Sequence, residues 1–256
     1  MSGMTINGSN NGIFKSYSRI SSGKRINSAA DDAAGLAIAK KMQREETGLS
    51  VGAENAKAGI GALNVADGAL GGMTDYLQRI RDLALRSMNG LNSAEDKQIY
   101  QNEIDQLKQG IQSLAKNTSF NEQKLLDGSK ADMGIATNPN GGGMKIQMEN
   151  STLEALGIAD LDVTSADFSL DSIDKALDMV SSRRGSLGAA TNRLEHTYNY
   201  NTRASLEQLG ARSRLEDLDI PKAVSEKQKK EVLGQYRMMM MRQQMNHKNM
   251  ITGMFF

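Results

Sequence analysis

The side chains that most often carry enzymatic chemistry are few in this sequence, and their spacing forms no known catalytic motif. The chain of 256 residues has no cysteine, which excludes disulfides and thiolate metal ligands. Its two histidines, His196 and His247, lie far apart, and neither belongs to an H-E-x-x-H zinc motif. We therefore expect no metal site and no cofactor.

Two pairs of adjacent carboxylates are the remaining candidates for general acid–base catalysis. Asp31-Asp32 and Glu45-Glu46 both lie in stretches with a helical pattern. Neighbouring acidic residues on a helix usually cap one of its ends or face solvent. We interpret both pairs as structural, and we predict that the protein is not an enzyme.

Composition narrows the class of protein further. The formal net charge is only +1, which argues against a nucleic-acid protein driven by bulk charge. Tryptophan is absent and aromatic residues make up 4%, so a thin core of Leu, Ile, Ala and Met is expected. No long apolar run is present, which excludes a membrane-spanning helix. The first twelve residues are polar and rich in Gly and Asn, so we expect no cleaved signal peptide.

Apolar residues at heptad spacing predict a first long helix from about residue 31 to residue 88. Within it, the steps between successive apolar residues are 4, 3, 4 and 3 at Leu49, Ala53, Ala56, Ile60 and Leu63. Each glycine inside a helix costs about 1 kcal/mol relative to alanine. We therefore interpret the glycines of this helix as close helix–helix contacts rather than a ligand site: Gly59, Gly61, Gly68, Gly71 and Gly72.

A second helix is predicted from about residue 94 to residue 116, antiparallel to the first because only a short turn joins them. Ser93 and Asp96 form a capping-box-like pair at its start. The heptad spacing then continues through Tyr100, Ile104, Leu107, Ile111 and Leu114.

A β-hairpin is predicted next. Met144, Ile146 and Met148 alternate with polar residues, the period of a strand with one buried face. Met133 and Ile135 indicate the partner strand, and a turn cluster of Asn, Pro and Gly separates the two.

A third helix is predicted from about residue 169 to residue 215, because its apolar residues fit one heptad seam: Ile173, Leu177, Val180, Leu187, Leu194 and Tyr198. At 1.5 Å per residue it would be about 70 Å long, which suits a rod better than a compact globule. The expected fold is therefore mainly α: an elongated, rod-like antiparallel helical bundle with a small β-hairpin insert. Pro221 is tolerated at a helix start, so it predicts a further helix to the C-terminus.

The C-terminal segment is basic and rich in methionine. Seven of the sixteen methionines lie in the last nineteen residues. Such a helix could bind a membrane surface or a nucleic acid, but we favour an amphipathic helix that packs on partner chains through its adaptable methionines. We expect neither nucleic-acid binding nor membrane insertion.

Several stretches of the chain resemble the two terminal signatures of bacterial flagellins, over about residues 20–220. The long run SSGKRINSAADDAAGLAI at 21–38 is the most specific of them. The others are LQRIRDLA at 77–84, SFN at 119–121, KLLDG at 124–128, LGA at 187–189, NRL at 192–194 and ARSRLED at 211–217.

The resemblance implies a structural subunit of the flagellar filament that polymerises head-to-tail into a helical tube for motility. Its terminal helices would pair as a coiled coil. The implied domains are inner-core terminal segments (1–22 and 218–256), a helical rod domain (23–127 and 165–217) and its hairpin region (128–164). No variable outer domain fits between the hairpin and the third helix, so this would be a short, core-only member. The atypical terminal sequences favour, as one alternative, a minor flagellin. The other alternative is a hook–filament junction protein, since such proteins share the terminal helices.

The resemblance also implies partners and sites. The protein would be extracellular in the flagellum, and its partners would be copies of itself, the flagellar export chaperone, the export apparatus and the host's flagellin-sensing Toll-like receptor. The receptor would contact Arg79, Leu83, Glu103 and Gln78, with Arg79 and Leu83 on one helix face. The alternative for Arg79 and Glu103 is an intramolecular surface ion pair. The chaperone and polymerisation helix would use Leu233, Tyr236, Met240 and Ile251.

Overall fold

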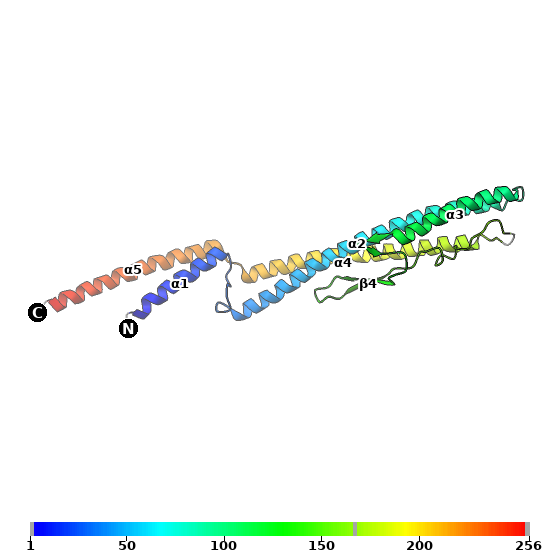
Figure 1. The fold of residues 1–256 in the computed structure, drawn as a ribbon. Coiled ribbons are helices and arrows are strands. Elements are labelled where there is room, and N and C mark those ends of the chain that lie inside the picture. Colours follow the sequence, from blue (N-terminus) through cyan, green and yellow to red (C-terminus); the bar gives the residue numbers. More distant parts are fainter. Residues whose placement is uncertain (1–2, 166–167, 254–256) are drawn as a thin grey trace. The chain divides into compact units, whose positions relative to one another are not determined.

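The chain is mainly helical, as predicted, with a small β-hairpin (Figure 1). The computed structural model describes residues 3–165 and 168–253. The helices are α1 (Gly3–Ser22), α2 (Ala33–Ser87), α3 (Ala94–Asn117), α4 (Asp171–Glu216) and α5 (Ile220–Gly253). The strands are β1 (Ser119–Phe120), β2 (Gln123–Lys124), β3 (Asp132–Ala136) and β4 (Gly143–Gln147). The three predicted long helices and the predicted helix start at Pro221 are confirmed.

Two compact units make up the chain. The terminal unit contains residues 1–46 and 206–256, and the central unit contains residues 47–205. In the described part of the chain, no helix combines the length and the apolar character needed to cross a membrane.

In the central unit, α2, α3 and α4 lie side by side and enclose a narrow apolar core (Figure 1). Residues that the heptad spacing assigned to one face are buried there, among them Leu63, Ile104, Ile111, Ile173 and Leu194. Burying each such side chain contributes about 1.5–3 kcal/mol, which offsets the weak helix propensity of the glycines. The hairpin and the segment that follows it add further aliphatic side chains to this core, among them Ile135, Ile146 and Ile158.

The predicted capping box begins α3. The Asp96 backbone N–H donates to Ser93 Oγ at 3.1 Å, and the Ser93 backbone N–H donates to Asp96 Oδ2 at 3.0 Å. The Ser93 backbone N–H, and after it the Ser93 hydroxyl, which donates to the same carboxylate oxygen at 2.8 Å, lower the pKa of Asp96. The capping box thus marks the end of the turn after α2. It fixes the residue at which α3 begins, and α3 then runs antiparallel to α2.

The hairpin of β3 and β4 has the predicted strands, and its turn rests on α2. Ile135 and Ile146 are buried against the core, as the period of two predicted. Asn201 of α4, itself 2% exposed, donates its Nδ2–H to the carbonyl oxygen of Thr137 at 2.7 Å. A Cβ at Gly52 of α2 would overlap the same Thr137 carbonyl group, so only glycine lets the turn approach this closely.

The glycines inside α2 were predicted to allow close helix–helix contacts, and the structure agrees for only some of them. A Cβ at Gly72 would lie 3.3 Å from a leucine of α3, the expected helix–helix contact. A Cβ at Gly59 would overlap the hairpin as well as approach α4. Gly68 and Gly71 meet no atom within 4 Å, so the expectation of tight packing is wrong for them within one chain.

In the terminal unit, α1 and α5 lie side by side and antiparallel (Figure 1). Tyr17 of α1 donates its hydroxyl hydrogen to Glu231 Oε1 at 3.1 Å, and its ring lies 3.9 Å from the Lys227 ammonium nitrogen. Lys230 adds a hydrogen bond to Ser16 Oγ at 3.3 Å. The pairing of the terminal helices is therefore carried by polar side chains in this stretch.

Candidate functional site

The two most specific sequence signatures meet in the terminal unit. The Arg25 backbone N–H donates to the Glu216 carbonyl oxygen at 2.7 Å, and the Leu218 N–H donates to the Gly23 carbonyl oxygen at 2.9 Å. The Lys24 ammonium group also binds the Glu216 carboxylate at 2.7 Å. Gly23 has a φ of +68°, a conformation that favours glycine. We call these residues the signature clasp. It holds the segment between α1 and α2 against the end of α4, and the sequence did not indicate it.

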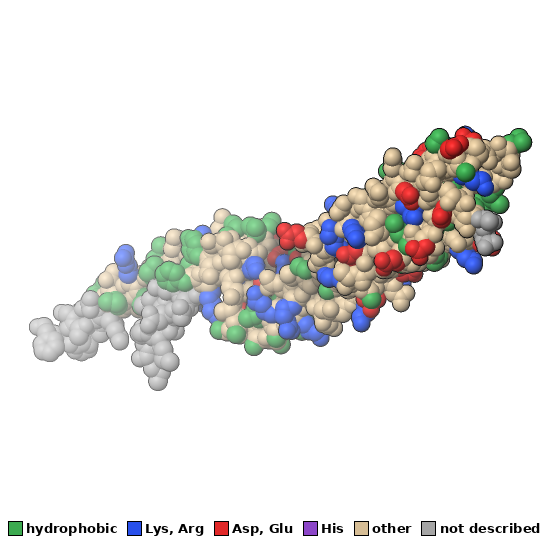
Figure 2. Space-filling model, turned by 45° about the vertical axis from the view of Figure 1, so that its right-hand side comes forward, with side chains coloured by type: hydrophobic (Ala, Val, Ile, Leu, Met, Phe, Trp, Pro, Cys, Tyr) green, Lys and Arg blue, Asp and Glu red, His purple; other side chains and the backbone are tan. Residues whose placement is uncertain are grey.

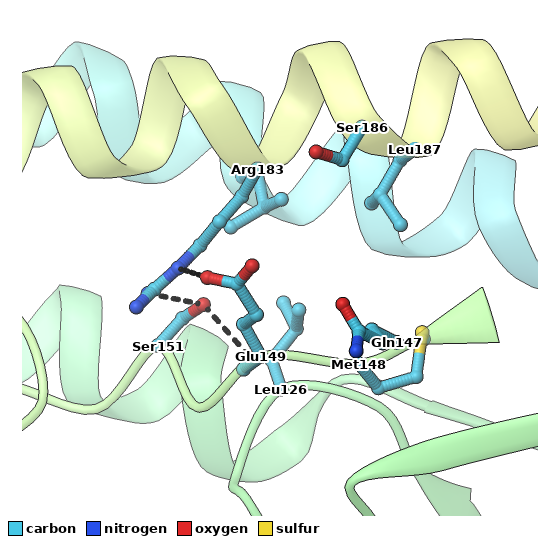
Figure 3. Close-up of a pocket in the computed structure, with 9 residues that line it drawn as sticks. Leu126, Gln147, Met148, Glu149, Ser151, Arg183, Ser186 and Leu187 are labelled. Atoms are coloured by element: carbon cyan, nitrogen blue, oxygen red, sulfur yellow. Dashed lines mark hydrogen bonds and ion pairs between the residues drawn. The ribbon is translucent and has the colours of Figure 1, made fainter.

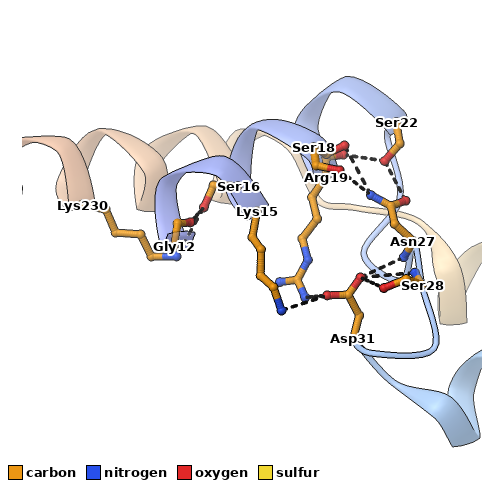
Figure 4. Close-up of polar contacts among 10 residues, drawn as sticks. All are labelled: Gly12, Lys15, Ser16, Ser18, Arg19, Ser22, Asn27, Ser28, Asp31 and Lys230. Carbon is orange, nitrogen blue, oxygen red and sulfur yellow. Dashed lines mark hydrogen bonds and ion pairs between the residues drawn. The ribbon is translucent and has the colours of Figure 1, made fainter. Parts of the chain in front are cut away.

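Asp31, in the first signature, organises the loop before α2 (Figure 4). Its carboxylate accepts a hydrogen bond from Arg19 at 3.0 Å and bonds from the backbone N–H groups of Asn27 and Ser28 at 3.3 Å. Burial alone would raise the pKa of Asp31, but these N–H groups and the Arg19 charge outweigh it and lower the pKa. Asp31 thus ties α1 to the loop that enters α2.

The other three carboxylates of the two acidic pairs also have structural surroundings. The Gly35 backbone N–H donates to Asp32 Oδ1 at 2.8 Å, so Asp32 caps the start of α2. Glu46 pairs with Arg212 of the second signature at 2.6 Å. Glu45 is exposed on α2. The pairs are not arranged around a common reaction centre.

Loss of the Asp31 charge is expected to loosen this loop in a pH-dependent way. Because the folded pKa lies below the ordinary value of about 3.9, the ionised carboxylate stabilises the loop near neutral pH. This contribution is lost as the pH falls through the lowered pKa. In Asp31→Asn, hydrogen exchange of the amides at residues 19–36 should be faster than in the unsubstituted chain at pH 7, with little difference near pH 2. Glu45→Gln, at an exposed carboxylate of the same unit, should exchange at the normal rate; equal protection in Asp31→Asn would contradict the assignment.

Arg79 and Glu103 form an ion pair between α2 and α3. Arg79 Nε and one of its terminal nitrogens both donate to Glu103 Oε1, at 2.9 and 2.6 Å. Both side chains remain about half exposed, and such a pair contributes about 0–1 kcal/mol. Gln78 is exposed beside it. The intramolecular pair that the sequence left as an alternative is therefore present, on a surface that is still accessible.

Leu83 does not share that surface. Its side chain is only 2% exposed and belongs to the core of the central unit. A step of four residues turns a helix by about 40°. Since Arg79 lies at the edge of the buried face, this rotation takes Leu83 inside. We expected Arg79 and Leu83 to present one accessible face. In the structure, Leu83 does not lie on the accessible face that holds Arg79.

A group of exposed apolar residues of α5 lies on the side of the helix opposite α1, while Ile220, Met238 and Met245, which are also exposed, fall on the α1 side. The half-buried residues Lys227, Glu231, Gly234 and Met241 form the seam that faces α1. At 100° per residue, the outward residues fall within about 120° of each other and about 180° from that seam. These residues, which we call the outward face, are Val232, Leu233, Tyr236, Met239 and Met240, all of them exposed. Figure 2 shows hydrophobic side chains gathered over the terminal helices.

The outward face includes three of the four residues predicted for the chaperone and polymerisation helix. Leu233, Tyr236 and Met240 are 45%, 60% and 45% exposed. The Ile251 side chain lies outside the described residues. In a self-sufficient pair of helices the apolar residues would face each other, whereas these three residues face away from α1.

A small cavity of the central unit lies between α4 and the segment after β4 (Figure 3). Arg183 spans its side, donating to Glu149 Oε2 at 2.9 Å and to Ser151 Oγ at 3.0 Å. Its volume of about 20 Å³ holds roughly one water molecule, so it is not a ligand pocket. Among the residues that the structure describes, no group of three or more His, Asp or Glu side chains could hold a metal ion.

Comparison with known proteins gives a consistent result for both ends of the chain. The family described as "Bacterial flagellin N-terminal helical region" matches residues 3–131. The family described as "Bacterial flagellin C-terminal helical region" matches residues 170–253. Between the two matches lie only the hairpin and the segment that follows it, residues 132–169.

Individual relatives extend over most of the chain. The chain is similar to a flagellin of Halalkalibacterium halodurans, with 37% identity over 236 residues that cover 90% of this chain and 86% of the relative. A flagellin of Bacillus subtilis is 36% identical over 277 residues, which cover 93% of this chain and 91% of the relative. Among solved structures, the flagellin of Bacillus cereus is 27% identical, with a TM-score of 0.53 over 58% of this chain and 88% of that one.

Proposed function

This chain belongs to the bacterial flagellin family and is a structural subunit of the extracellular flagellar filament, and we propose that its subunits assemble through the outward face of α5. Members of the family are structural filament proteins rather than enzymes. The observation that carries the proposal is the placement of the outward-face residues of α5 away from α1. Apolar side chains at this spacing gain free energy only when another surface covers them.

A filament also needs contacts that do not close on themselves. Different patches must meet at each contact, because only such heterologous contacts propagate into an open helix. The outward face of α5 and the exposed surfaces of the central unit differ in chemistry: acidic and basic side chains are mixed over the central unit (Figure 2). We propose that the terminal segments form the inner layer of the polymer and the helices of the central unit the layer outside it. Electron microscopy of purified protein seeded with filament fragments tests this: thin helical polymers support it, and failure to extend the seeds contradicts it.

The same face is our proposed docking surface for the flagellar export chaperone. Methionines in this stretch provide an adaptable apolar surface for a partner that must later release the subunit. Export would then deliver the chain to the growing filament. The expected export without cleavage of a signal peptide stays a prediction, which the N-terminal peptide of filament-derived protein would test.

Recognition by the flagellin-sensing Toll-like receptor is a further proposal. Because Leu83 is buried, the variants that test it must be chosen from the exposed residues. Arg79, Gln78 and Glu103 form an accessible polar surface across α2 and α3. Arginine in such a position makes directional hydrogen bonds to a partner. Leu83 would have to act indirectly, by supporting α2 beneath this surface, since it is buried.

Arg79→Ala is expected to weaken receptor binding by the soluble monomer at least about tenfold, the cost of about 1.4 kcal/mol that defines a weak hot spot. Its unfolding free energy should change by only about 0–1 kcal/mol. Leu83→Ala is unsuitable as a surface variant, because emptying a core position costs about 2–5 kcal/mol. Arg86→Ala, on the exposed side of the same helix, is the control. Receptor binding that is undiminished in Arg79→Ala would contradict the site.

A further inference from the structure

Methionine makes up the part of the outward face that follows Tyr236. Met239 and Met240 are 65% and 45% exposed. Met73 and Met148, by contrast, are buried in the core of the central unit, at 0% and 5%. Peroxides oxidise accessible thioethers to sulfoxides, and buried ones react more slowly. Other methionines of α5 are also exposed, and of these Met238 and Met245 lie on the α1 side, whereas Met239 and Met240 lie on the face that assembly would bury.

We propose that Met239 and Met240 form a peroxide-sensitive modification site that controls assembly through α5, an inference that rests on the proposed function. An oxygen atom passes from hydrogen peroxide to the methionine sulfur: the O–O bond breaks and an S–O bond forms. The sulfur is oxidised by two electrons, and the peroxide is reduced to water. The product is a polar sulfoxide in place of an apolar thioether.

The position of the two methionines decides what oxidation changes. The contacts with α1 are made by Lys227, Lys230 and Glu231, on the opposite side of α5. A sulfoxide on the outward face leaves these contacts in place, so the monomer keeps its fold. In the polymer the same oxygen is buried without a matched hydrogen-bond donor, which is unfavourable. Oxidation of Met239 and Met240 therefore acts on assembly and not on folding.

Limited peroxide treatment of the full-length monomer tests the inference. Peptide mass spectrometry should find Met239 and Met240 oxidised at least about tenfold faster than Met73, because of their exposure. The critical concentration for growth on filament seeds should rise roughly tenfold, the effect of about 1.4 kcal/mol for an unpaired polar group. Incubation with methionine sulfoxide reductases of both types should restore growth.

Two double variants locate the effect. Met239→Leu with Met240→Leu keeps the apolar surface at similar volume, so it should polymerise normally both before and after peroxide. Met239→Gln with Met240→Gln carries polar groups from the start, so its critical concentration should be raised without peroxide. A peroxide-treated Leu variant that stops polymerising, or a Gln variant that polymerises normally, would show that these methionines are not the site.

The proposed function and this inference fail in different ways. If untreated protein extends seeds and the oxidised protein does so equally well, the inference is wrong and the proposed function stands. If untreated protein does not extend seeds at all, the proposed function is wrong, and the inference falls with it.

Discussion

Leu233→Glu combined with Tyr236→Glu is expected to abolish growth on filament seeds while the monomer stays folded. Both side chains are exposed and lie on the face of α5 opposite α1, so the charges cost little in the monomer. In the polymer two carboxylates would lose their water without gaining a partner. We expect the critical concentration to rise at least about hundredfold, equivalent to about 2.7 kcal/mol. Seeded growth measured by pelleting and electron microscopy checks this.

The matched control keeps both positions apolar. Leu233→Met with Tyr236→Phe should polymerise like the unsubstituted chain, and circular dichroism should show equal helix content in all three proteins. Glutamate is a good helix former, so the charged variant is not expected to melt α5. If the charged variant extends seeds at the normal concentration, the outward face is not an assembly surface.

The charged variant also separates the two uses proposed for this face. Loss of both chaperone binding and polymerisation is expected, because both partners are proposed to cover the same apolar residues. If the variant binds the chaperone normally but does not polymerise, the chaperone proposal for Leu233 and Tyr236 is wrong, and the assembly proposal is unaffected.

Gly52→Ala is expected to destabilise the central unit by about 1–3 kcal/mol, the usual cost of inserting atoms into a packed site. The new Cβ would overlap the backbone carbonyl of Thr137, which Asn201 also holds. Neither backbone can move away without breaking a helix or the hairpin turn. Denaturant unfolding monitored by circular dichroism gives the free energy, and hydrogen exchange of residues 132–147 shows whether the hairpin loosens first.

Gly68→Ala provides the same substitution in the same helix without the clash. No atom lies within 4 Å of its Cβ position, so the variant should be more stable by up to about 1 kcal/mol through the better helix propensity of alanine. A Gly52→Ala variant as stable as Gly68→Ala would mean that the turn does not rest on α2. If Gly68→Ala stabilises the monomer yet weakens polymerisation, that open glycine is covered by another subunit.

Local patterns in the sequence were enough to predict most of the elements. Heptad spacing located α2, α3 and α4 because the buried side of a helix must be apolar every three or four residues. Ser93 and Asp96 predicted the start of α3 because a capping box is made by residues three apart. The strands β3 and β4 followed from the alternation around Met144 and Met133. The short hairpin of β1 and β2 was missed, since strands of two residues are too short to show a period.

The sequence by itself determined the helices α2 to α5, the hairpin of β3 and β4 and, through its signatures, the family. Only the tertiary structure decided which residues are accessible and which distant segments touch. Periodicity assigned Arg79 and Leu83 to one face of α2, but how far α3 and α4 cover that face depends on how the helices pack, and this packing buries Leu83. The same holds for the signature clasp, where Arg25 meets Glu216, and for Gly52 beneath the hairpin turn. Such contacts join residues more than eighty positions apart, and no local pattern carries information about partners at that distance.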